Sequence, residues 1–295
     1  MTSNLDTQSQ HLGIRQHLIR MKDSLRIAFK NPSFLSGFII LLIVCVIAFF
    51  PEWFTIYDPV AISVGDPLIP PSAEHLFGTD NFGRDVFARV IFATQIDLQL
   101  AVLSTIVPFV VGSLLGLVAG YYGKKIDMII MRILDVLMAF PFTVLVISII
   151  TILGNGLQNI YIAIWLVGWI AFARLVRAEV LRVKEEEFIQ AARVAGFSDL
   201  RIIFRHVLPN AISPAVVYAT SYAVLCMLTA AGMSFLGLGV QPPTPEWGAL
   251  LSEGRSFIGV AWWMTLFPGI FMAVTGIGFS LLGDGLTDFI RAKGR

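Results

Sequence analysis

The chain has 295 residues, of which 56% are hydrophobic and only 14% are charged. Soluble globular proteins are about 45–50% apolar and about 25% charged, so a chain of this composition is not expected to remain in water. The 21 basic and 20 acidic residues leave a net charge of +1, which excludes a basic nucleic-acid-binding protein. The composition therefore predicts an integral membrane protein.

Uncharged stretches predict the transmembrane helices, because a helix needs about 20 apolar residues to cross the hydrocarbon core. Five such stretches are present: residues 31–51, 98–123, 136–173, 207–245 and 256–283. The third is long enough for two helices, and Gly154-Asn155-Gly156 predicts a tight turn between them. The fourth ends in a run of prolines, so its helix is expected to end near Gly232. The sequence thus predicts six transmembrane helices and an all-α fold.

The basic residues predict the orientation of these helices. With a cytoplasmic N-terminus, 18 lysines and arginines fall on the cytoplasmic side and 3 on the outer side, in agreement with the positive-inside rule. Both termini are therefore expected in the cytoplasm. Residues 1–33 are predicted to form a cytoplasmic amphipathic segment, and residues 34–295 a six-span domain. Within that domain, 52–97 and 233–258 are predicted extracytoplasmic loops, and 177–209 is a long cytoplasmic loop.

Few side chains in the predicted spans suit ion coupling or chemistry. Arg132 and Asp135 lie one helical turn apart at a span edge and are expected to pair locally, whereas ion-coupled carriers usually keep ionisable groups deep in their spans. Gly123-Lys124-Lys125 lacks the flanking residues of a phosphate-binding loop. Cys45, Cys226 and the scattered histidines predict neither a disulfide nor a metal site. No catalytic, cofactor-binding or metal-binding residue is therefore predicted, and any transport must draw its energy from another chain.

The second predicted span carries a stripe of glycines, which recur every four residues at Gly112, Gly116 and Gly120. Such a stripe lets another helix approach closely, and we expect ordinary packing inside the bundle rather than a dedicated dimer contact. Three prolines also lie inside predicted spans, where the helices are expected to tolerate them without shaping a pathway: Pro108, Pro141 and Pro268.

The most informative segment is the loop between the fourth and fifth spans. Phe188, Ala192 and Ala195 have the spacing of one helix face. Gly196 then offers a C-cap, and Ser198 offers an N-cap for a second helix. The second helix carries its own apolar stripe: Leu200, Ile203, Phe204 and Val207. The pattern predicts two short helices at an angle, with small alanines at the elbow that let a partner approach the backbone.

Two other interpretations fit the layout of this helix pair. A DNA-binding helix-turn-helix has a similar layout, but residues 179–206 carry five basic and five acidic side chains and lie between two spans, which excludes DNA binding. An amphipathic loop that lies on the bilayer surface stays open as an alternative.

The segments Gln190-Ala191-Ala192, Gly196 and Leu208-Pro209 closely resemble the cytoplasmic "EAA" loop of the permease subunits of binding-protein-dependent ABC importers. The chain departs from that family at Gln190, where the family has glutamate, and at His206, where it has an aliphatic residue. A neutral amide still forms hydrogen bonds, so coupling is expected to survive, and any role that needs a carboxylate falls to Glu187 or is absent. The resemblance implies that ten residues couple the chain to an ATPase: Glu187, Phe188, Gln190, Ala191, Ala192, Arg193, Gly196, Leu200, Leu208 and Pro209.

Motifs elsewhere resemble the dipeptide/oligopeptide/nickel branch of that family, and within it the permease usually encoded second of the two. Before the second span these motifs are His75, Gly78-Thr79-Asp80, Gly83-Arg84-Asp85 and Arg89. Before the last span they are residues 235–239, 241–243 and 246–248. Within the last span they are Phe267-Pro268-Gly269 and residues 282–286. The resemblance covers the chain from about residue 20 to its end.

Simple structural roles are also expected for these motifs. Gly78-Thr79-Asp80 is interpreted as a turn before an N-cap, and Asp85 and Arg89 as an i,i+4 helix pair. Glu246-Trp247 is interpreted as an interfacial tryptophan anchor, and Gly283-Asp284-Gly285 as the end of the last helix.

The resemblance implies the type I ABC importer permease fold in the bacterial inner membrane. The expected partners are a homologous second permease, two cytoplasmic ABC ATPases, an extracytoplasmic solute-binding protein and membrane lipid, with no nucleic acid. The chain itself is expected to be no enzyme and to bind no cofactor, because ATP and magnesium are used by the ATPases. The loop 188–206 would act as the lever of alternating access.

The implied cargo is a di- or oligopeptide or a related small solute, since members of the branch carry peptides, glutathione, nickel complexes, opines and sugars. Two alternatives from other classes remain. The chain could be a non-transporting membrane scaffold that binds a cytoplasmic partner through the same loop, or a carrier that works without an ATPase.

Overall fold

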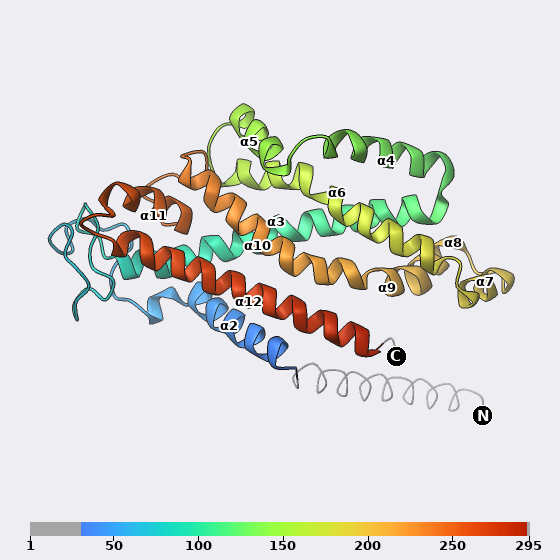
Figure 1. The fold of residues 1–295 in the computed structure, drawn as a ribbon, viewed down its shortest axis with the longest axis horizontal. Coiled ribbons are helices and arrows are strands. Elements are labelled where there is room, and N and C mark those ends of the chain that lie inside the picture. The colour runs from blue at the N-terminus through green and yellow to red at the C-terminus, as the bar shows by residue number, and fades with distance from the viewer. Residues whose placement is uncertain (1–30, 294–295) are drawn as a thin grey trace, which may run out of the picture.

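Residues 31–293 are described by the structure, a computed structural model, and they form an elongated bundle of helices (Figure 1). Within this part of the chain no β-strand forms, and only one isolated bridge joins Thr79 to Asp85. The predicted all-α fold is therefore confirmed. The amphipathic segment predicted at 1–33 lies almost wholly outside the described residues.

Seven long helices make up most of the bundle: α2 (Pro32–Phe49), α3 (Val86–Tyr122), α4 (Lys124–Met138), α5 (Phe142–Leu153), α6 (Leu157–Val183), α10 (Ser213–Phe235) and α12 (Trp263–Lys293). Short helices and single turns join them: η1 (Pro51–Trp53), α7 (Glu187–Val194), α8 (Asp199–Ile202), η2 (Ile203–Val207), α9 (Leu208–Ala211), α11 (Trp247–Gly254) and η3 (Arg255–Phe257).

Five of the long helices, α2, α3, α6, α10 and α12, are long and apolar enough to cross a membrane. The sixth predicted span is a bent pair, α4 and α5, whose axes meet at 85°. The predicted number of six is reached when this pair counts as one broken span. The bundle thus contains one interrupted crossing among continuous ones.

The break between α4 and α5 corrects the expectation that Pro141 would be tolerated within a span. Pro141 has no N–H to continue the helix, and its ring disfavours helical geometry for Phe140. It stands at the N-cap of α5, after α4 has ended at Met138. Pro108 and Pro268, by contrast, lie inside α3 and α12 without ending them.

Helix α3 begins at Val86, well before the uncharged stretch that starts at residue 98. Asp85 caps its first turn by accepting a hydrogen bond from the Ala88 N–H at 2.7 Å. With 37 residues the helix is about 55 Å long, far more than the roughly 30 Å of a hydrocarbon core. The search for uncharged residues did not include the first three turns of α3, because they contain Arg89 and Asp97. Both of these charged side chains are buried in the fold.

The glycine stripe of α3 packs against α6 inside the chain, as expected. A Cβ at Gly112 would lie 2.6 Å from the Phe172 Cβ, and one at Gly120 would lie 2.8 Å from the Val180 Cβ. A Cβ at Gly116 would collide with the Ala173 carbonyl oxygen. Because these positions carry no side chain, α3 and α6 can pack against each other at close range.

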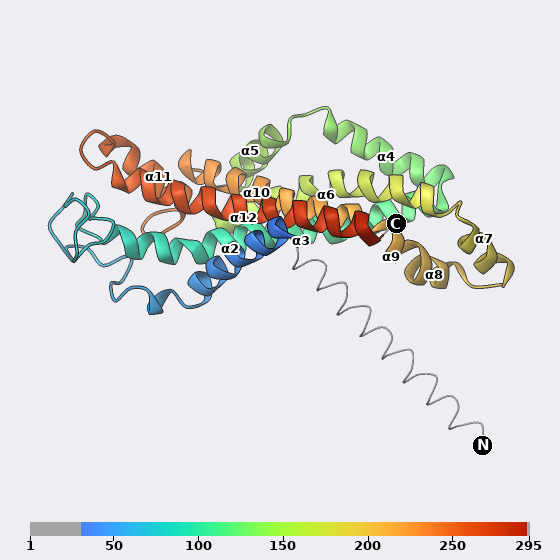
Figure 2. The same ribbon diagram turned by 60° about the horizontal axis from the view of Figure 1, so that its bottom comes forward.

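The two ends of the bundle differ. In both ribbon views α11 and the segment 52–85 lie at one end, and α7 and α8 lie at the opposite end (Figures 1 and 2). The loops predicted on opposite sides of the membrane therefore lie at opposite ends of the molecule.

A cluster of buried ion pairs ties the segment before α3 to α11. Arg89 Nη1 donates to Asp80 Oδ2 and to Glu253 Oε2, both at 2.7 Å, and Arg84 Nη2 donates to Glu253 Oε2 at 2.7 Å. The expected Asp85–Arg89 pair is wrong, because Asp85 instead caps α3 and lies 2.8 Å from His75 Nδ1. In the folded chain Asp85 pairs with His75, and Arg89 pairs with Asp80 and Glu253, so the two do not pair with each other.

Two further local interpretations are wrong. Trp247 is fully buried and not an interfacial anchor: its backbone N–H donates to Asp97 Oδ2 at 3.0 Å and its indole N–H to the Val90 carbonyl at 3.2 Å. The last helix does not end at residues 283–285, because α12 runs through them to Lys293. The glycine at 285 lies against Phe34, so it serves packing with α2 instead of termination.

Replacement of Gly116 by alanine tests the α3–α6 contact. The new methyl group would collide with backbone atoms, which cannot rotate away, so Gly116→Ala should destabilise the folded chain by about 1–3 kcal/mol. Gly269→Ala is the matched control, since it lies in a helix with nothing within 4 Å of the added Cβ. Thermal unfolding in mild detergent measures both, and an equal midpoint for the two variants would contradict the packing argument.

The Glu246 carboxyl predicts a pH dependence of stability. Both of its oxygens accept backbone N–H groups at the start of α11, from Gly248 at 3.0 Å and Ala249 at 2.8 Å, yet burial raises its pKa above the ordinary 4.5. As the pH rises above 4.5, Glu246 loses its proton in the unfolded chain before it does so in the folded chain. The stability of the folded chain should therefore fall as pH rises. Thermal midpoints measured from pH 4.5 upward should fall less steeply for Glu246→Gln than for the natural chain.

Candidate functional site

The loop between α6 and α10 folds into the two short helices predicted for it. Helix α7 ends at Val194, Gly196 follows with φ of +78°, and α8 begins after Ser198. The C-cap glycine and the N-cap position are therefore confirmed. The Ser198 side chain makes no capping hydrogen bond, so the residue supplies only its extended backbone.

The face of α7 that packs on the bundle differs from the expected one. Ile189 and Ala192 are buried, whereas Phe188 is 45% exposed and Ala195 is exposed. In the second helix Ile202, Ile203 and Val207 are buried. The expected stripe there is displaced because residues 203–207 form a π-helix, which widens the turn by one residue.

Apolar side chains remain exposed on the other face of this loop. Val194 is 90% exposed, Leu200 is 65% exposed and Phe204 is 54% exposed. Together with smaller exposed neighbours they form what is called here the coupling surface: Phe188, Ala191, Val194, Ala195, Gly196, Leu200 and Phe204. Several large apolar side chains left exposed on one loop are typical of a protein-binding surface.

The coupling surface is fastened to the end of α3. Tyr121 donates its hydroxyl hydrogen bond to Asp199 Oδ1 at 2.7 Å, and Lys184 Nζ donates to the Gly120 carbonyl at 3.1 Å. The Arg193 guanidinium lies over the Tyr121 ring at 5.6 Å. A displacement of the loop would therefore pull directly on α3.

These anchoring contacts could not be found in the sequence, because they join residues far apart in the chain. The same holds for Arg177 of α6, which makes a two-point ion pair with Asp127 of α4, with Nη2 to Oδ2 at 2.6 Å. Asp135 pairs with Arg174 at 3.3 Å and not with Arg132, so the expected local pair is wrong.

All ten residues predicted for ATPase coupling lie in this one loop or at its junction with α9. Four of them belong to the coupling surface: Phe188, Ala191, Gly196 and Leu200. Of the other six, Ala192 is buried and Leu208 is half-buried. Gln190 Nε2 donates to the Lys184 carbonyl at 3.3 Å, a bond that a glutamate at this position could not donate. The His206 ring stacks on Phe197 with centroids 6.1 Å apart. Their role in coupling stays a prediction.

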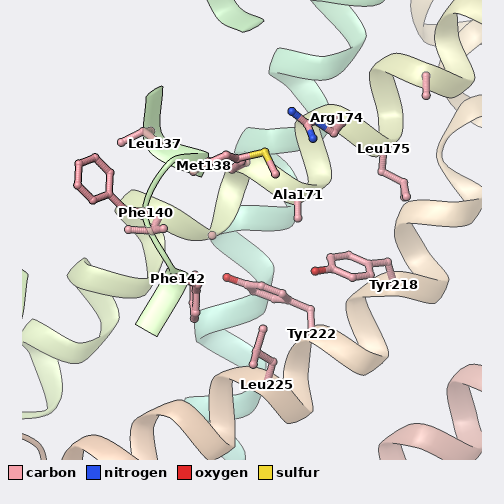
Figure 3. A pocket seen from close by; sticks show the side chains of 14 residues that line it. Leu137, Met138, Phe140, Phe142, Ala171, Arg174, Leu175, Tyr218, Tyr222 and Leu225 are labelled. Carbon is pink, nitrogen blue, oxygen red and sulfur yellow. The ribbon is translucent and has the colours of Figure 1, made fainter. Parts of the chain in front are cut away.

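A cavity of about 560 Å³ lies beside the break between α4 and α5 (Figure 3). Its walls come from the end of α4, the start of α5, the middle of α6 and α10. Most lining side chains are apolar or aromatic, and Arg174 contributes the one charged group among them. Elsewhere in the described part of the chain, no three His, Cys, Asp or Glu side chains are placed to hold a metal ion.

Comparison with known families identifies this bundle. Residues 112–294 match the family described as binding-protein-dependent transport system inner membrane component. The chain belongs to this family. Residues 20–71 also match the N-terminal transmembrane domain of oligopeptide transport permease C. The family resemblance predicted from the sequence is thus confirmed, as is the multi-pass location of the chain in the membrane.

Several known permeases align with almost the whole chain. The dipeptide transport system permease protein of Alkalihalophilus pseudofirmus is 45% identical, over 90% of this chain and 87% of its own length. The glutathione transport system permease protein of Pectobacterium atrosepticum is 42% identical, over 90% of this chain and 88% of its own length. The di/tripeptide transport system permease protein of Pseudomonas aeruginosa is 39% identical, over 89% of each.

The fold is similar to that of the MetNI methionine ABC transporter in inward-facing conformations, with a TM-score of 0.56 and 20% sequence identity. The likeness covers 70% of this chain and 97% of that one, and it confirms the ABC importer permease fold. The chain is therefore a non-catalytic transmembrane permease subunit, and separate ATPase subunits hydrolyse ATP.

Removal of one hydroxyl tests how the loop is fastened. Tyr121→Phe deletes the bond to Asp199 and should raise hydrogen exchange in residues 187–200 several-fold, as expected for the loss of a hydrogen bond of about 1 kcal/mol or more. Tyr122→Phe is the control, because that neighbouring ring is 42% exposed. Equal exchange in both variants would show that the hydroxyl does not hold the loop.

Proposed function

We propose that this chain imports di- or oligopeptides as one of two permeases in an ATP-driven, binding-protein-dependent transporter. The cargo class is supported by the names of the similar proteins, which carry dipeptides, di/tripeptides and glutathione. Its partners would be a homologous second permease, two cytoplasmic ATPase subunits or domains and an extracytoplasmic solute-binding protein.

The observation that carries the proposal is the coupling surface. Val194, Leu200 and Phe204 expose apolar side chains on a loop that is otherwise rich in charge. A cleft in the cytoplasmic ATPase would cover these side chains, which explains why they are not buried against the bundle. The positive-inside rule favours a cytoplasmic position for the same end of the molecule.

The anchors of the loop suggest how force passes into the membrane. When ATP-bound ATPases close, they would move α7 and α8 together as a rigid lever. The Tyr121–Asp199 and Lys184–Gly120 bonds would carry that motion into α3. Because α3 is packed closely along α6, the two helices would move as one body and open the pathway outward for the cargo.

Introduction of a charge into the coupling surface tests this function. Val194→Asp should leave insertion and folding unchanged, because the side chain is 90% exposed, but should abolish copurification of the ATPase and ATP-dependent peptide uptake in vesicles. Ile56→Asp is the matched control, since Ile56 is 93% exposed at the opposite end of the bundle. Ala192→Glu is a poorer choice, since it would bury a carboxylate and disturb the loop itself.

The outcomes separate the alternatives. Normal ATPase binding and uptake by Val194→Asp would refute the coupling surface. A natural chain that binds a soluble partner but shows no ATP-dependent uptake would support the scaffold, and uptake without any ATPase would support the stand-alone carrier.

A further inference from the structure

The cavity beside the broken span has the size and lining of a ligand site. Its volume of about 560 Å³ lies within the roughly 300–1,000 Å³ of small-molecule pockets. Figure 3 shows Tyr218 and Tyr222 projecting from α10 toward Phe142 at the start of α5, with Arg174 of α6 on another side. An apolar wall with a few polar groups suits a ligand that has both kinds of surface.

The backbone at the break exposes unpaired hydrogen-bond donors. The N–H groups of Phe142, Thr143 and Val144 open α5, and none has an acceptor among the described residues. Such donors are costly against acyl chains and are tolerated only beside protein or a water-filled cavity. The start of this 12-residue helix also carries a partial positive charge, which favours an anion.

Arg174 brings a full positive charge to the same cavity. Its contact with Asp135 uses one guanidinium nitrogen at 3.3 Å, and both side chains are more than half exposed. An arginine has five N–H donors, so most of this one is available to a second carboxylate, which it would bind in a two-point contact.

Tyr222 adds a buried polar atom with little hydrogen bonding. The residue is 2% exposed and lines the cavity, and its hydroxyl makes no well-directed hydrogen bond in the described part of the chain, with only a weak contact to the Cys226 thiol. Space for the hydroxyl exists because Gly168 has no side chain, since a Cβ there would collide with the oxygen. A thiol is a weak hydrogen-bond partner, and a polar ligand in the cavity would supply a stronger one.

We propose that this cavity is a contact site for the cargo, and that it recognises a short peptide with a free carboxylate. The carboxylate binds Arg174, and the positive potential at the start of α5 favours a negative charge in the same cavity. Apolar side chains of the peptide lie against Phe140, Phe142 and Tyr218, and Tyr222 donates to a peptide carbonyl. This inference rests on the proposed peptide import and adds a selectivity that belongs to the permease itself.

Photolabelling of the assembled importer in phosphatidylcholine nanodiscs, without the solute-binding protein, tests the site directly. The probe is the dipeptide alanyl-photoleucine at millimolar concentration, compared with its C-terminal amide. Peptide mapping should find adducts in residues 137–142, 167–178 or 218–225. Labelling should be about tenfold weaker with the amide, as expected for the loss of a charge-assisted contact.

Two variants with matched controls locate the contact. Arg174→Gln should lower labelling by the acid about tenfold and remove the difference between acid and amide, whereas Arg132→Gln, on an exposed arginine outside the cavity, should change neither. Tyr222→Phe should lower labelling about threefold, and Tyr122→Phe should not. Absent or misplaced adducts, equal labelling by acid and amide, or an unchanged Arg174→Gln variant would each overturn the proposal.

Two further arms separate this inference from its neighbours. In phosphatidylglycerol nanodiscs the labelling should persist, and its disappearance would assign the cavity to an anionic lipid headgroup and refute a peptide site. ATP-dependent uptake by the natural importer is measured separately with its binding protein. Uptake without cavity labelling refutes only the cargo contact, whereas labelling without uptake refutes the proposed import.

Discussion

Close packing of α3 on α6 is the contact on which the rest of this permease depends. It requires three positions without a side chain on one face of α3, at Gly112, Gly116 and Gly120. The last of these turns also presents the carbonyl and the tyrosine that hold the loop between α6 and α10. The same stripe therefore fixes both the centre of the bundle and the position of the coupling surface at its end.

The broken span is the second organising feature, and it follows from one residue. Pro141 ends a helix that an apolar stretch alone would continue, and the freed backbone groups must then lie away from lipid acyl chains. This requirement turns the side of the molecule that holds α4 and α5 toward protein or water. In a transport protein such a side is where a pathway is expected, and the cavity found there is bordered by α6, the helix that ends in the coupling loop.

Buried polar groups at the other end hold the long connections in place. The pairs among Asp80, Arg89 and Glu253 join the segment before α3 to α11, and Asp97 accepts the backbone N–H of Trp247. Breaking one member of such a buried network would leave a charge without a partner, at a cost of about 3–5 kcal/mol. The end of the bundle that contains α11 is therefore sensitive to the loss of any one of these charged side chains.

Composition, apolar stretches and glycine spacing determined the membrane class, the helical fold, the six crossings and the short helix pair, because these follow from local residue patterns and from the thickness of a bilayer. The motif around Gln190 and Gly196 likewise identified the family. Only the tertiary structure decided which partners Asp85, Asp135 and Trp247 take, which face of α7 is exposed, and that Pro141 breaks a span beside a cavity. Such choices depend on residues far apart in the chain that compete for the same contacts, and no local pattern records that competition.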